Sequence, residues 1–434
     1  MTIVRKCAKY FFLFLFFLFV LIFFGYNNTD IIWNYGFSHA IRIGEIPYHD
    51  FNLIATPLYA FIMSVGLWIF DSYLVFLIEQ SILCTVLYAL FEKMFSKNAN
   101  LIIFVLCFPI FYTIFPNYNF LVFFLIVVLL YLENYHPNDV LIGFVLGLLV
   151  LSKHTVGGVI TLCSIIACFD IKRAGKRCLG FSVPLFCFLV YLLITGSFTS
   201  FIDLSVLGLF DFGDSNGSFG GISIFLAAMI FFHFLVLFRR NWKDKNLYYL
   251  LGAFSFVIPI CDFFHFNYLI AVYMVVLLLR YQNSIPDLRN MTWILLSVLV
   301  ILNIILNYSV YEDMKFCSFD HFEGYLTTQK HEKYMKKILK SYSHSNNAYM
   351  YSFSNMFFDI ASNHKITYFD VPLYGNFGYH GISKMKSIID QMHGVYFYID
   401  SYDNIQFAKE IYDYIKEKGT SITSDCGFEI FYNE

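Results

Sequence analysis

The chain has 434 residues, of which 59% are hydrophobic and only 14% are charged, and its formal net charge is −2. Soluble domains carry about 25% charged residues. The composition therefore excludes a soluble enzyme, a disordered chain and a nucleic-acid-binding protein, and it indicates a polytopic membrane protein. The small net charge identifies no binding partner.

Apolar runs follow one another along the first 310 residues. The first covers 10–24 and follows three basic residues, and no small-residue cleavage site comes after it, so we expect a retained span rather than a signal peptide. A helical span needs about 20 apolar residues, with a lower limit near 17. The other runs cover roughly 57–70, 72–91, 99–116, 117–134, 138–154, 156–171, 178–195, 221–238, 247–261, 267–280 and 291–309.

Lysine and arginine predict the orientation, because cytoplasmic segments of membrane proteins carry an excess of both. The basic N-terminus and the clusters within 172–177 and 239–245 should therefore be cytoplasmic. Before the C-terminal part, the predicted outer segments carry only Arg42 and Lys153. This asymmetry predicts a multi-pass protein of the plasma or inner membrane with a cytoplasmic N-terminus.

One apolar run must not cross if this orientation is right. Six crossings would otherwise separate the first outer loop from 172–177, and an even number would place that basic cluster outside. The best candidate is the run 57–70, which is only 14 residues long, starts at Pro57 and is followed by Asp71. We therefore expect eleven spans, all α-helical, and a juxtamembrane helix in the first outer loop.

The last part of the chain is polar and has a different pattern. We expect a transmembrane domain over 1–310 and a small extracytoplasmic α/β domain over 311–434, because predicted strands alternate there with predicted helices. Cys317 and Cys426 lie in this domain and are either bridged or separately buried. The predicted strands cover 348–353, 365–369 and 395–399, and the predicted helices cover 326–341 and 403–418, the latter ending at Gly419.

Ionisable groups are rare in membrane-embedded chains and are functional candidates by default. In the predicted topology the unusual polar groups gather at the outer side, where four segments offer acids, a base and a cation at one depth. They are Asp30, His39, Arg42, Glu45, His49 and Asp50 in the first outer loop, Asn117 and Asn119 at another outer turn, Lys153 and His154 at the outer end of the run 138–154, and Asp262 and His265 at the outer end of the run 247–261.

Most of these residues also have a structural interpretation. Asp30 and Asp50 are placed to cap the segments that follow them, and Arg42 to extend along the membrane surface. The histidines at 39 and 49 are more often interfacial than catalytic, and Asp262 and His265 would pair on one helix face. Acids at 203, 211 and 214 fall in a Gly/Ser-rich loop that is typical of solvated turns.

Lys153 is harder to explain structurally. It runs against the distribution of positive charge and lies beside a leucine-rich segment. We expect it to bind an anion such as phosphate.

Three short stretches of the first outer loop resemble a known superfamily. Asp30-Ile-Ile-Trp-Asn34, Gly44-Glu-Ile-Pro-Tyr-His-Asp-Phe51 and Thr56-Pro-Leu-Tyr59 resemble the first outer loop of GT-C glycosyltransferases, which include protein O-mannosyltransferases and lipid A aminoarabinose transferases. Leu151-Ser-Lys153 is similar to a Leu-Thr/Ser-Lys element of these enzymes, and Asp262-Phe-Phe-His265 to a later acid/His element. The resemblance covers roughly 25–160, is weaker at 255–268 and does not extend into the C-terminal domain.

The resemblance implies a transferase that moves a sugar from a polyprenyl-phosphate donor to an acceptor hydroxyl at the outer membrane face, in the assembly of cell-surface glycans. Asp30 would be the catalytic base and Asp50 would assist it, whereas Lys153 and Arg42 would stabilise the leaving phosphate. A single base with direct displacement would invert the anomeric centre. Further substrate-binding residues would be Glu45, His49, His154, Asp262 and His265.

The acceptor would be a glycan, a lipid or a protein, and membrane lipid would surround the spans. No cofactor is required with certainty. A divalent metal is allowed, although the ten cysteines show no metal-binding spacing and no ligand set is assigned. A polysaccharide polymerase is a variant of the same reaction.

Two readings from other classes remain open. A flippase for a lipid-linked glycan would also need cations, but it should line a path through the membrane with polar groups rather than gather them at one face. A scaffold that presents the C-terminal domain would not need Lys153.

Overall fold

The computed structural model describes residues 3–26, 28–95, 112–216, 218–219, 221–258, 260–284, 289–306, 308–317, 319–343, 347–367, 372–400, 409–425 and 428–434. The chain forms two compact units. We call the first, 1–25, 77–190 and 217–311, the helical unit. The second, 26–76, 191–216 and 312–434, is the mixed unit. The predicted C-terminal domain thus corresponds to the last segment of the mixed unit. The same unit also contains the two earlier segments, 26–76 and 191–216.

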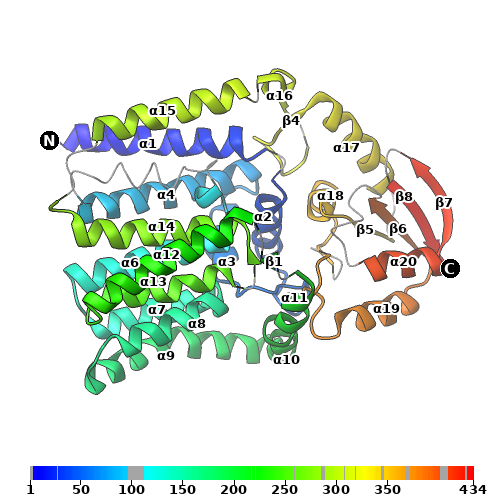
Figure 1. The fold of residues 1–434 in the computed structure, drawn as a ribbon. Helices are drawn as coiled ribbons and strands as arrows, with labels where there is room; N and C mark the ends of the chain where they lie inside the picture. The colour runs from blue at the N-terminus through cyan, green and yellow to red at the C-terminus, as the bar shows by residue number, and fades with distance from the viewer. Residues whose placement is uncertain are drawn as a thin grey trace. The chain divides into compact units, whose positions relative to one another are not determined.

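Long apolar helices show that the chain is an integral membrane protein. Six helices of the described residues are long and apolar enough to cross a membrane, and several of them lie side by side (Figure 1). They are α1 (Ile3–Phe24), α4 (Tyr73–Phe95), α6 (Tyr118–Tyr135), α9 (Ile171–Ile194), α12 (Gly221–Arg240) and α14 (Phe263–Tyr281). A further apolar helix, α15 (Arg289–Leu306), precedes α16 (Tyr308–Glu312). Most of the run 99–116 lies outside the described residues.

Three of the eleven expected spans form helices shorter than a span needs. The runs 138–154 and 156–171 become α7 (Asp139–Ser152) and α8 (His154–Ile166), whose 14 and 13 residues cover about 20 Å of a hydrocarbon core of about 30 Å. The two helices pack closely, because a Cβ on Gly157 would lie 2.6 Å from Val150. The run 247–261 becomes α13 (Lys245–Ala253), a 3-10 turn η3 (Phe254–Val257) and the short strand β2 (Ile260–Cys261).

The expected juxtamembrane helix is α3 (Leu58–Leu67), which has ten residues. A helix of this length covers about 15 Å and is too short to cross a bilayer. It packs against α2 (Thr29–Arg42) within the mixed unit. The run that was expected not to cross thus contains a helix of only ten residues.

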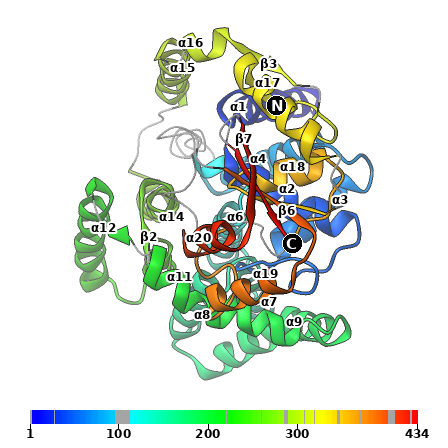
Figure 2. The same ribbon diagram turned by 90° about the vertical axis from the view of Figure 1, so that its right-hand side faces the viewer.

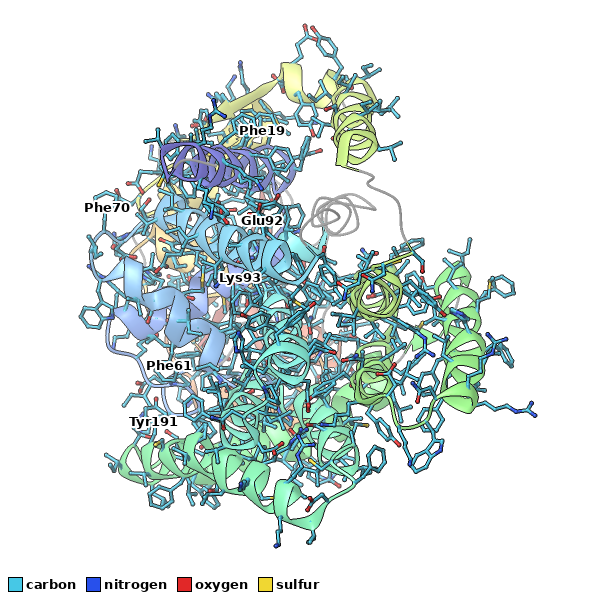
Figure 3. All side chains as sticks on the ribbon, turned by 90° about the vertical axis from the view of Figure 1, so that its left-hand side faces the viewer. Phe19, Phe61, Phe70, Glu92, Lys93 and Tyr191 are labelled. Carbon is cyan, nitrogen blue, oxygen red and sulfur yellow. The ribbon has the colours of Figure 1, made fainter. Side chains whose placement is uncertain are left out.

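Helices α1 and α4 are joined by a polar contact. Glu92 of α4 accepts hydrogen bonds from Lys9 Nζ at 2.7 Å and from Tyr10 Oη at 2.8 Å, and Figure 3 shows Glu92 beside α1. An ion pair of two half-exposed side chains contributes little free energy. It does set the register of the first span against its neighbour.

The helical unit also contains a buried ionic network centred on Arg177 of α9. Its guanidinium pairs with Glu133 of α6, bonds Asp139 of α7 at 3.0 Å and donates to Ser164 Oγ of α8 at 2.6 Å. Sequence reasoning counted Arg177 only as a member of the basic cluster within 172–177, whereas in the structure its side chain is fully buried. The acids that hold it are 38 and 44 residues earlier in the chain.

We expect Arg177→Met to destabilise the helical unit strongly, because the almost completely buried Glu133 would keep only the partly exposed Lys245, at 3.3 Å, as its ionic partner. Breaking a buried pair in this way typically costs about 3–5 kcal/mol. Arg173→Met is the matched control, since Arg173 also pairs with Asp139 but is about one third exposed, and such pairs contribute about 0–1 kcal/mol. Thermal unfolding in detergent measures both, and equal small shifts would contradict the buried network.

The mixed unit contains a four-stranded sheet in the order β5-β6-β8-β7 (Figure 1). Figure 2 shows β6 and β7 of this sheet from another side. Strands β5 (Ala348–Tyr351) and β6 (Val395–Asp400) are parallel, whereas β8 (Phe428–Asn433) is antiparallel to both β6 and β7 (Thr420–Asp425). Phe397, Ile399 and Phe431 pack against α19 (Gly381–Gln391) and α20 (Lys409–Lys418). On the other face Tyr398 contacts Tyr342 of α17 (Gln329–Tyr342). The expected small α/β region is therefore present.

Several C-terminal elements differ in detail from the sequence expectation. Residues 326–328 form strand β4, paired with β3 (Met314–Phe316), and α17 begins only after Thr328, whose side chain caps it. Residues 365–367 form no strand, and 368–371, 401–408 and Cys426 lie outside the described residues. Cys317 forms no disulfide with a cysteine that the structure describes, and its Sγ lies 3.0 Å from the carbonyl oxygen of Tyr325. The remaining elements are α10 (Phe198–Phe201), η1 (Tyr112–Ile114), η2 (Ile202–Leu207), α11 (Gly208–Asn216), β1 (Ser218–Phe219) and α18 (Asn355–Ala361).

Candidate functional site

Lys153 lies at the break between α7 and α8, in an extended conformation (φ −156°). Its Nζ donates to Asn119 Oδ1 at 3.0 Å and lies 5.4 Å from the centre of the Tyr118 ring, both in the first turn of α6. The break places one partly buried cation among apolar helices. A cation held in this way is suited to bind an anion.

Helix N-termini surround this lysine. Helix α8 starts directly after Lys153 and has no side-chain cap, and α6 starts after Asn117. The first N–H groups of a helix lack partners within the helix and, with the helix dipole, favour a negative group. The local structure therefore adds to the attraction of the ammonium group.

Asp262 and His265 join the same cluster from α14. Asp262 is the N-cap of α14, and its Oδ1 accepts the backbone N–H of His265 and contacts His265 Nδ1, both at 2.8 Å. The expected pairing of these two residues is confirmed. The charges of Asp262 and Lys153 also interact. Of the predicted site residues, the helical unit thus brings together Lys153, Asp262 and His265, with His154 next to Lys153 in the chain.

Two asparagines of the helical unit have buried amide atoms with no hydrogen-bond partner among the described residues. They are Nδ2 of Asn119, which holds Lys153, and both amide atoms of Asn267, in the first turns of α14. Unsatisfied buried polar atoms are rare in folded proteins. Sequence reasoning missed Asn267, although an amide five residues after Asp262 within an apolar helix was a usable signal.

Asp30 belongs to the mixed unit and lies in the first turn of α2. The residue that caps α2 is Asn28, whose Oδ1 accepts the N–H of Ile31 at 3.3 Å. The capping explanation of Asp30 was therefore wrong. Its half-buried carboxylate lies at the end of the helix where the dipole favours a negative charge.

Asp50 is anchored to the turn that follows α2. Its Oδ2 accepts the N–H of Ile46 at 2.7 Å, and its Oδ1 lies 2.8 Å from His49 Nδ1. Burial alone would raise the pKa of Asp50, but these two contacts lower it overall. Asp50 thus closes the turn that precedes it, whereas the structural interpretation expected it to cap a segment. Asp50 follows the C-terminal end of α2, whereas Asp30 lies at its N-terminal end.

Glu45 is buried, and its Oε2 has no hydrogen-bond partner among the described residues. Burial raises the pKa of Glu45 to about 7, against the attraction of Lys365 and with a further rise from Asp50. Burial also raises the pKa of Asp359, and the negative charge of Glu45 raises it further. Glu45 is therefore a carboxyl group that changes charge near neutral pH.

We expect the wild-type protein to lose stability as the pH rises from about 5 to about 8, and we expect Glu45→Gln to make this loss smaller. The folded pKa of Glu45 lies above the unfolded value, so its contribution is fully favourable below the unfolded pKa and is lost as the pH rises through about 7. The full effect is about 3 kcal/mol at most. Unfolding midpoints across this range measure it. Asp50→Asn is the control with the opposite sign, because the lowered pKa of Asp50 makes its stabilisation disappear only as the pH falls.

Arg42 forms an ion pair with Asp71. Its Nη1 lies 3.4 Å from Oδ2 of Asp71, a residue that sequence reasoning used only to mark the end of an apolar run. This contact connects Arg42 with the end of the α3 segment.

A cavity of about 380 Å³ opens beside the first outer loop within the mixed unit. Sequence reasoning treated Asp203 as a solvated turn residue, and that was wrong, because Asp203 pairs with Lys384 of α19 and accepts the N–H of Tyr379 at 3.3 Å. The signal was not local, since the partners are about 180 residues away. The lining residues are Tyr48, His49, Asn52, Ser200, Asp203, Leu204, Phe377, Lys384, Met385 and Ile388.

Two solved structures are similar to this chain in fold. Both are crystal structures of ArnT from Cupriavidus metallidurans. The apo structure has a TM-score of 0.55 at 10% identity over 98% of each chain. The structure bound to undecaprenyl phosphate has a TM-score of 0.58 at 9% identity, over 99% of this chain and 98% of that one.

The predicted resemblance to the GT-C superfamily is thereby confirmed at the level of the fold. Identities this low establish the fold alone. No protein-family model matches the sequence, and no curated protein is significantly similar to it.

Proposed function

We propose that the protein is a membrane glycosyltransferase that takes a sugar from a polyprenyl-phosphate donor and transfers it, with inversion, to an acceptor hydroxyl in cell-surface glycan assembly. The observation that carries the proposal is Lys153, held at helix N-termini in a chain whose fold matches ArnT over almost its full length. One of those ArnT structures holds undecaprenyl phosphate.

The donor phosphate is assigned to the Lys153 cluster. Three features support this: the ammonium group, the uncapped start of α8 and the amide of Asn119. As the bond between the sugar and the phosphate breaks, negative charge grows on the phosphate. Donors fixed in advance at that position stabilise the transition state. Asp262 and His265 orient the cluster through their pairing.

Asp30 is assigned as the base that removes the proton of the acceptor hydroxyl while its oxygen attacks the anomeric carbon. Asp50 supports the loop through Ile46, and Arg42 remains a weaker candidate for phosphate binding because of its contact with Asp71. One base and one displacement invert the configuration at that carbon.

We assign the acceptor to the cavity of the mixed unit. Tyr48 and Phe377 offer apolar surfaces, whereas His49, Asn52 and the Asp203–Lys384 pair offer polar ones. This combination suits a sugar ring or a lipid headgroup that presents a hydroxyl.

We further propose that the mixed unit faces outwards. Ile69→Cys, 88% exposed after α3, should then react with an impermeant maleimide in intact cells. Trp242→Cys, 50% exposed between α12 and α13, should react only after permeabilisation. The reverse pattern would invert the orientation and move the assigned site to the cytoplasmic face.

The function is tested with the lipid-linked sugar that accumulates when the gene is deleted. Purified protein in proteoliposomes should release polyprenyl phosphate from this donor only when acceptor is present. Movement of intact donor between leaflets, without release of polyprenyl phosphate, would replace the transferase with the flippase. If the protein shows neither activity, the remaining interpretation is a scaffold that presents the C-terminal region.

A further inference from the structure

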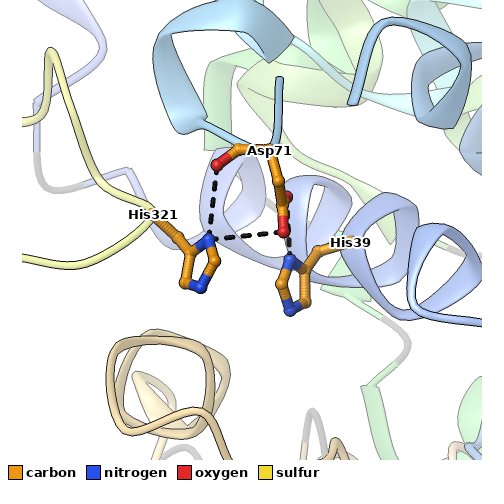
Figure 4. Close-up of side chains that lie close together, drawn as sticks. All are labelled: His39, Asp71 and His321. Carbon is orange, nitrogen blue, oxygen red and sulfur yellow. Dashed lines mark hydrogen bonds and ion pairs between the residues drawn. The ribbon is translucent and has the colours of Figure 1, made fainter. Parts of the chain in front are cut away.

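Three side chains from distant parts of the mixed unit converge on one point. They are His39 in the last turn of α2, Asp71 after α3, and His321 in the segment that enters the C-terminal region. One ligand atom from each lies within 4.8 Å of the other two. Figure 4 shows both Nδ1 atoms turned towards the carboxylate of Asp71. Sequence reasoning treated His39 as interfacial and did not consider Asp71 or His321 as metal ligands.

The distances fit a metal ion. In a tetrahedral site with bonds of 2.0–2.1 Å, neighbouring ligand atoms lie about 3.3 Å apart. His39 Nδ1 lies 3.0 Å from Asp71 Oδ1, and His321 Nδ1 lies 3.3 Å from Asp71 Oδ2. The side chains of His39 and Asp71 are almost completely buried. Asp71 Oδ2 has no hydrogen bond of acceptable geometry among the described residues.

The surroundings of His321 also favour a cation. Its Nδ1 faces two acceptors, the carboxylate and the backbone carbonyl of Asp71, both at 3.3 Å. Its Nε2 lies 3.1 Å from Oδ1 of Asn363. A neutral imidazole that donates from Nε2 to Asn363 presents a lone pair at Nδ1, where a metal ion between the nitrogen and the carboxylate removes the repulsion.

The backbone holds His321 in place before any ion binds. The residue has a left-handed conformation (φ 63°), which is uncommon for a side chain of this size. Its carbonyl accepts the hydroxyl of Tyr35 at 2.9 Å and the N–H of Tyr73 at 2.8 Å. A strained residue that its neighbours hold so firmly is typical of a functional position.

We propose that His39, Asp71 and His321 form a site for a divalent transition metal, with zinc as the ion that two imidazoles and a carboxylate suit best. Water would complete the coordination at the partly exposed side of His321. The ion would fasten α2, the end of the α3 segment and the entry to the C-terminal region, since binding to ligands so distant in the chain stabilises the folded state.

Arg42 supplies a distinguishing signature. Its guanidinium lies 3.4 Å from Asp71 Oδ2 and opposes a second cation there, although the side chain is about one third exposed and can turn to solvent. If a metal binds, Arg42→Met should tighten zinc binding severalfold. If Asp71 instead pairs only with protonated histidines, the same change creates no affinity for zinc.

The test uses full-length protein in detergent, stripped with EDTA and with its thiols alkylated, because free cysteines also bind zinc. Wild-type protein should take up about one equivalent of zinc, with a rise in its unfolding midpoint. His39→Gln, Asp71→Asn and His321→Gln should each lose at least tenfold in affinity. The exposed His393→Gln serves as the matched control and should bind like the wild type.

Two outcomes would overturn the site. One is wild-type protein that takes up no zinc and shows no change in its unfolding midpoint. The other is undiminished zinc affinity in folded His39→Gln and His321→Gln. Should a variant not fold, cobalt substitution of the wild type decides: tetrahedral cobalt bound by histidine absorbs visible light strongly, whereas only the weak absorption of hydrated, octahedral cobalt would overturn the site.

Discussion

Asp30→Asn is expected to abolish sugar transfer while the protein remains folded and inserted in the membrane. The change removes the charge of the carboxylate but keeps its shape, and Asn28 rather than Asp30 caps α2, so the helix keeps its N-terminus. Loss of a catalytic base typically reduces the rate by about two to four orders of magnitude. Release of polyprenyl phosphate from a defined donor, in membranes that contain equal amounts of protein, measures the effect.

Asp390→Asn is the matched control for this variant. Asp390 lies on α19 in the same unit, half-exposed and paired with Lys418, and its replacement should leave transfer unchanged. Near-normal transfer by Asp30→Asn would remove Asp30 from the mechanism. Equal losses in both variants would point instead to a general sensitivity of the mixed unit to lost charge.

Lys153→Met is expected to weaken donor binding by about 10- to 100-fold, because a hydrogen bond to a charged group contributes about 1.5–3 kcal/mol. Acceptor binding should change much less. Methionine fills a similar volume and is tolerated among apolar helices, so the fold should survive. Lys153→Arg should restore part of the affinity, with the remainder lost because the guanidinium fork has a different geometry.

Donor affinity is measured by titration of the purified protein with the polyprenyl-phosphate lipid. Lys93→Met, an exposed lysine in the last turn of α4, is the control for loss of a positive charge. An unchanged donor affinity together with a weakened acceptor affinity would move Lys153 from the donor to the acceptor side of the reaction.

The two variants also separate the assigned roles. Asp30→Asn should lower the rate at saturating donor, because proton transfer takes place in the transition state. Lys153→Met should show its main effect at low donor concentration, where binding limits the rate. If both variants changed the rate at saturating donor and the rate at low donor concentration in the same way, the two residues would not have separate functions.

The sequence alone determined the class of protein. Composition and apolar runs identified a polytopic membrane protein, and the basic clusters required the run 57–70 not to cross, where the structure has the ten-residue α3. Short motifs around Asp30 and Lys153 pointed to the GT-C fold. These signals are local, because hydrophobicity, charge and turn chemistry act over a few residues and survive in any arrangement of the helices.

Tertiary structure decided which polar residues meet. The break at Lys153, the burial of Arg177 between Glu133 and Asp139, and the pairing of Asp203 with Lys384 depend on contacts between residues far apart in the chain. The same holds for His39, Asp71 and His321, of which the last lies 250 residues after Asp71. A histidine or an aspartate has the same local pattern whether it is solvated, paired or poised to bind a metal. Its role is set by the packing of segments that no window of sequence contains.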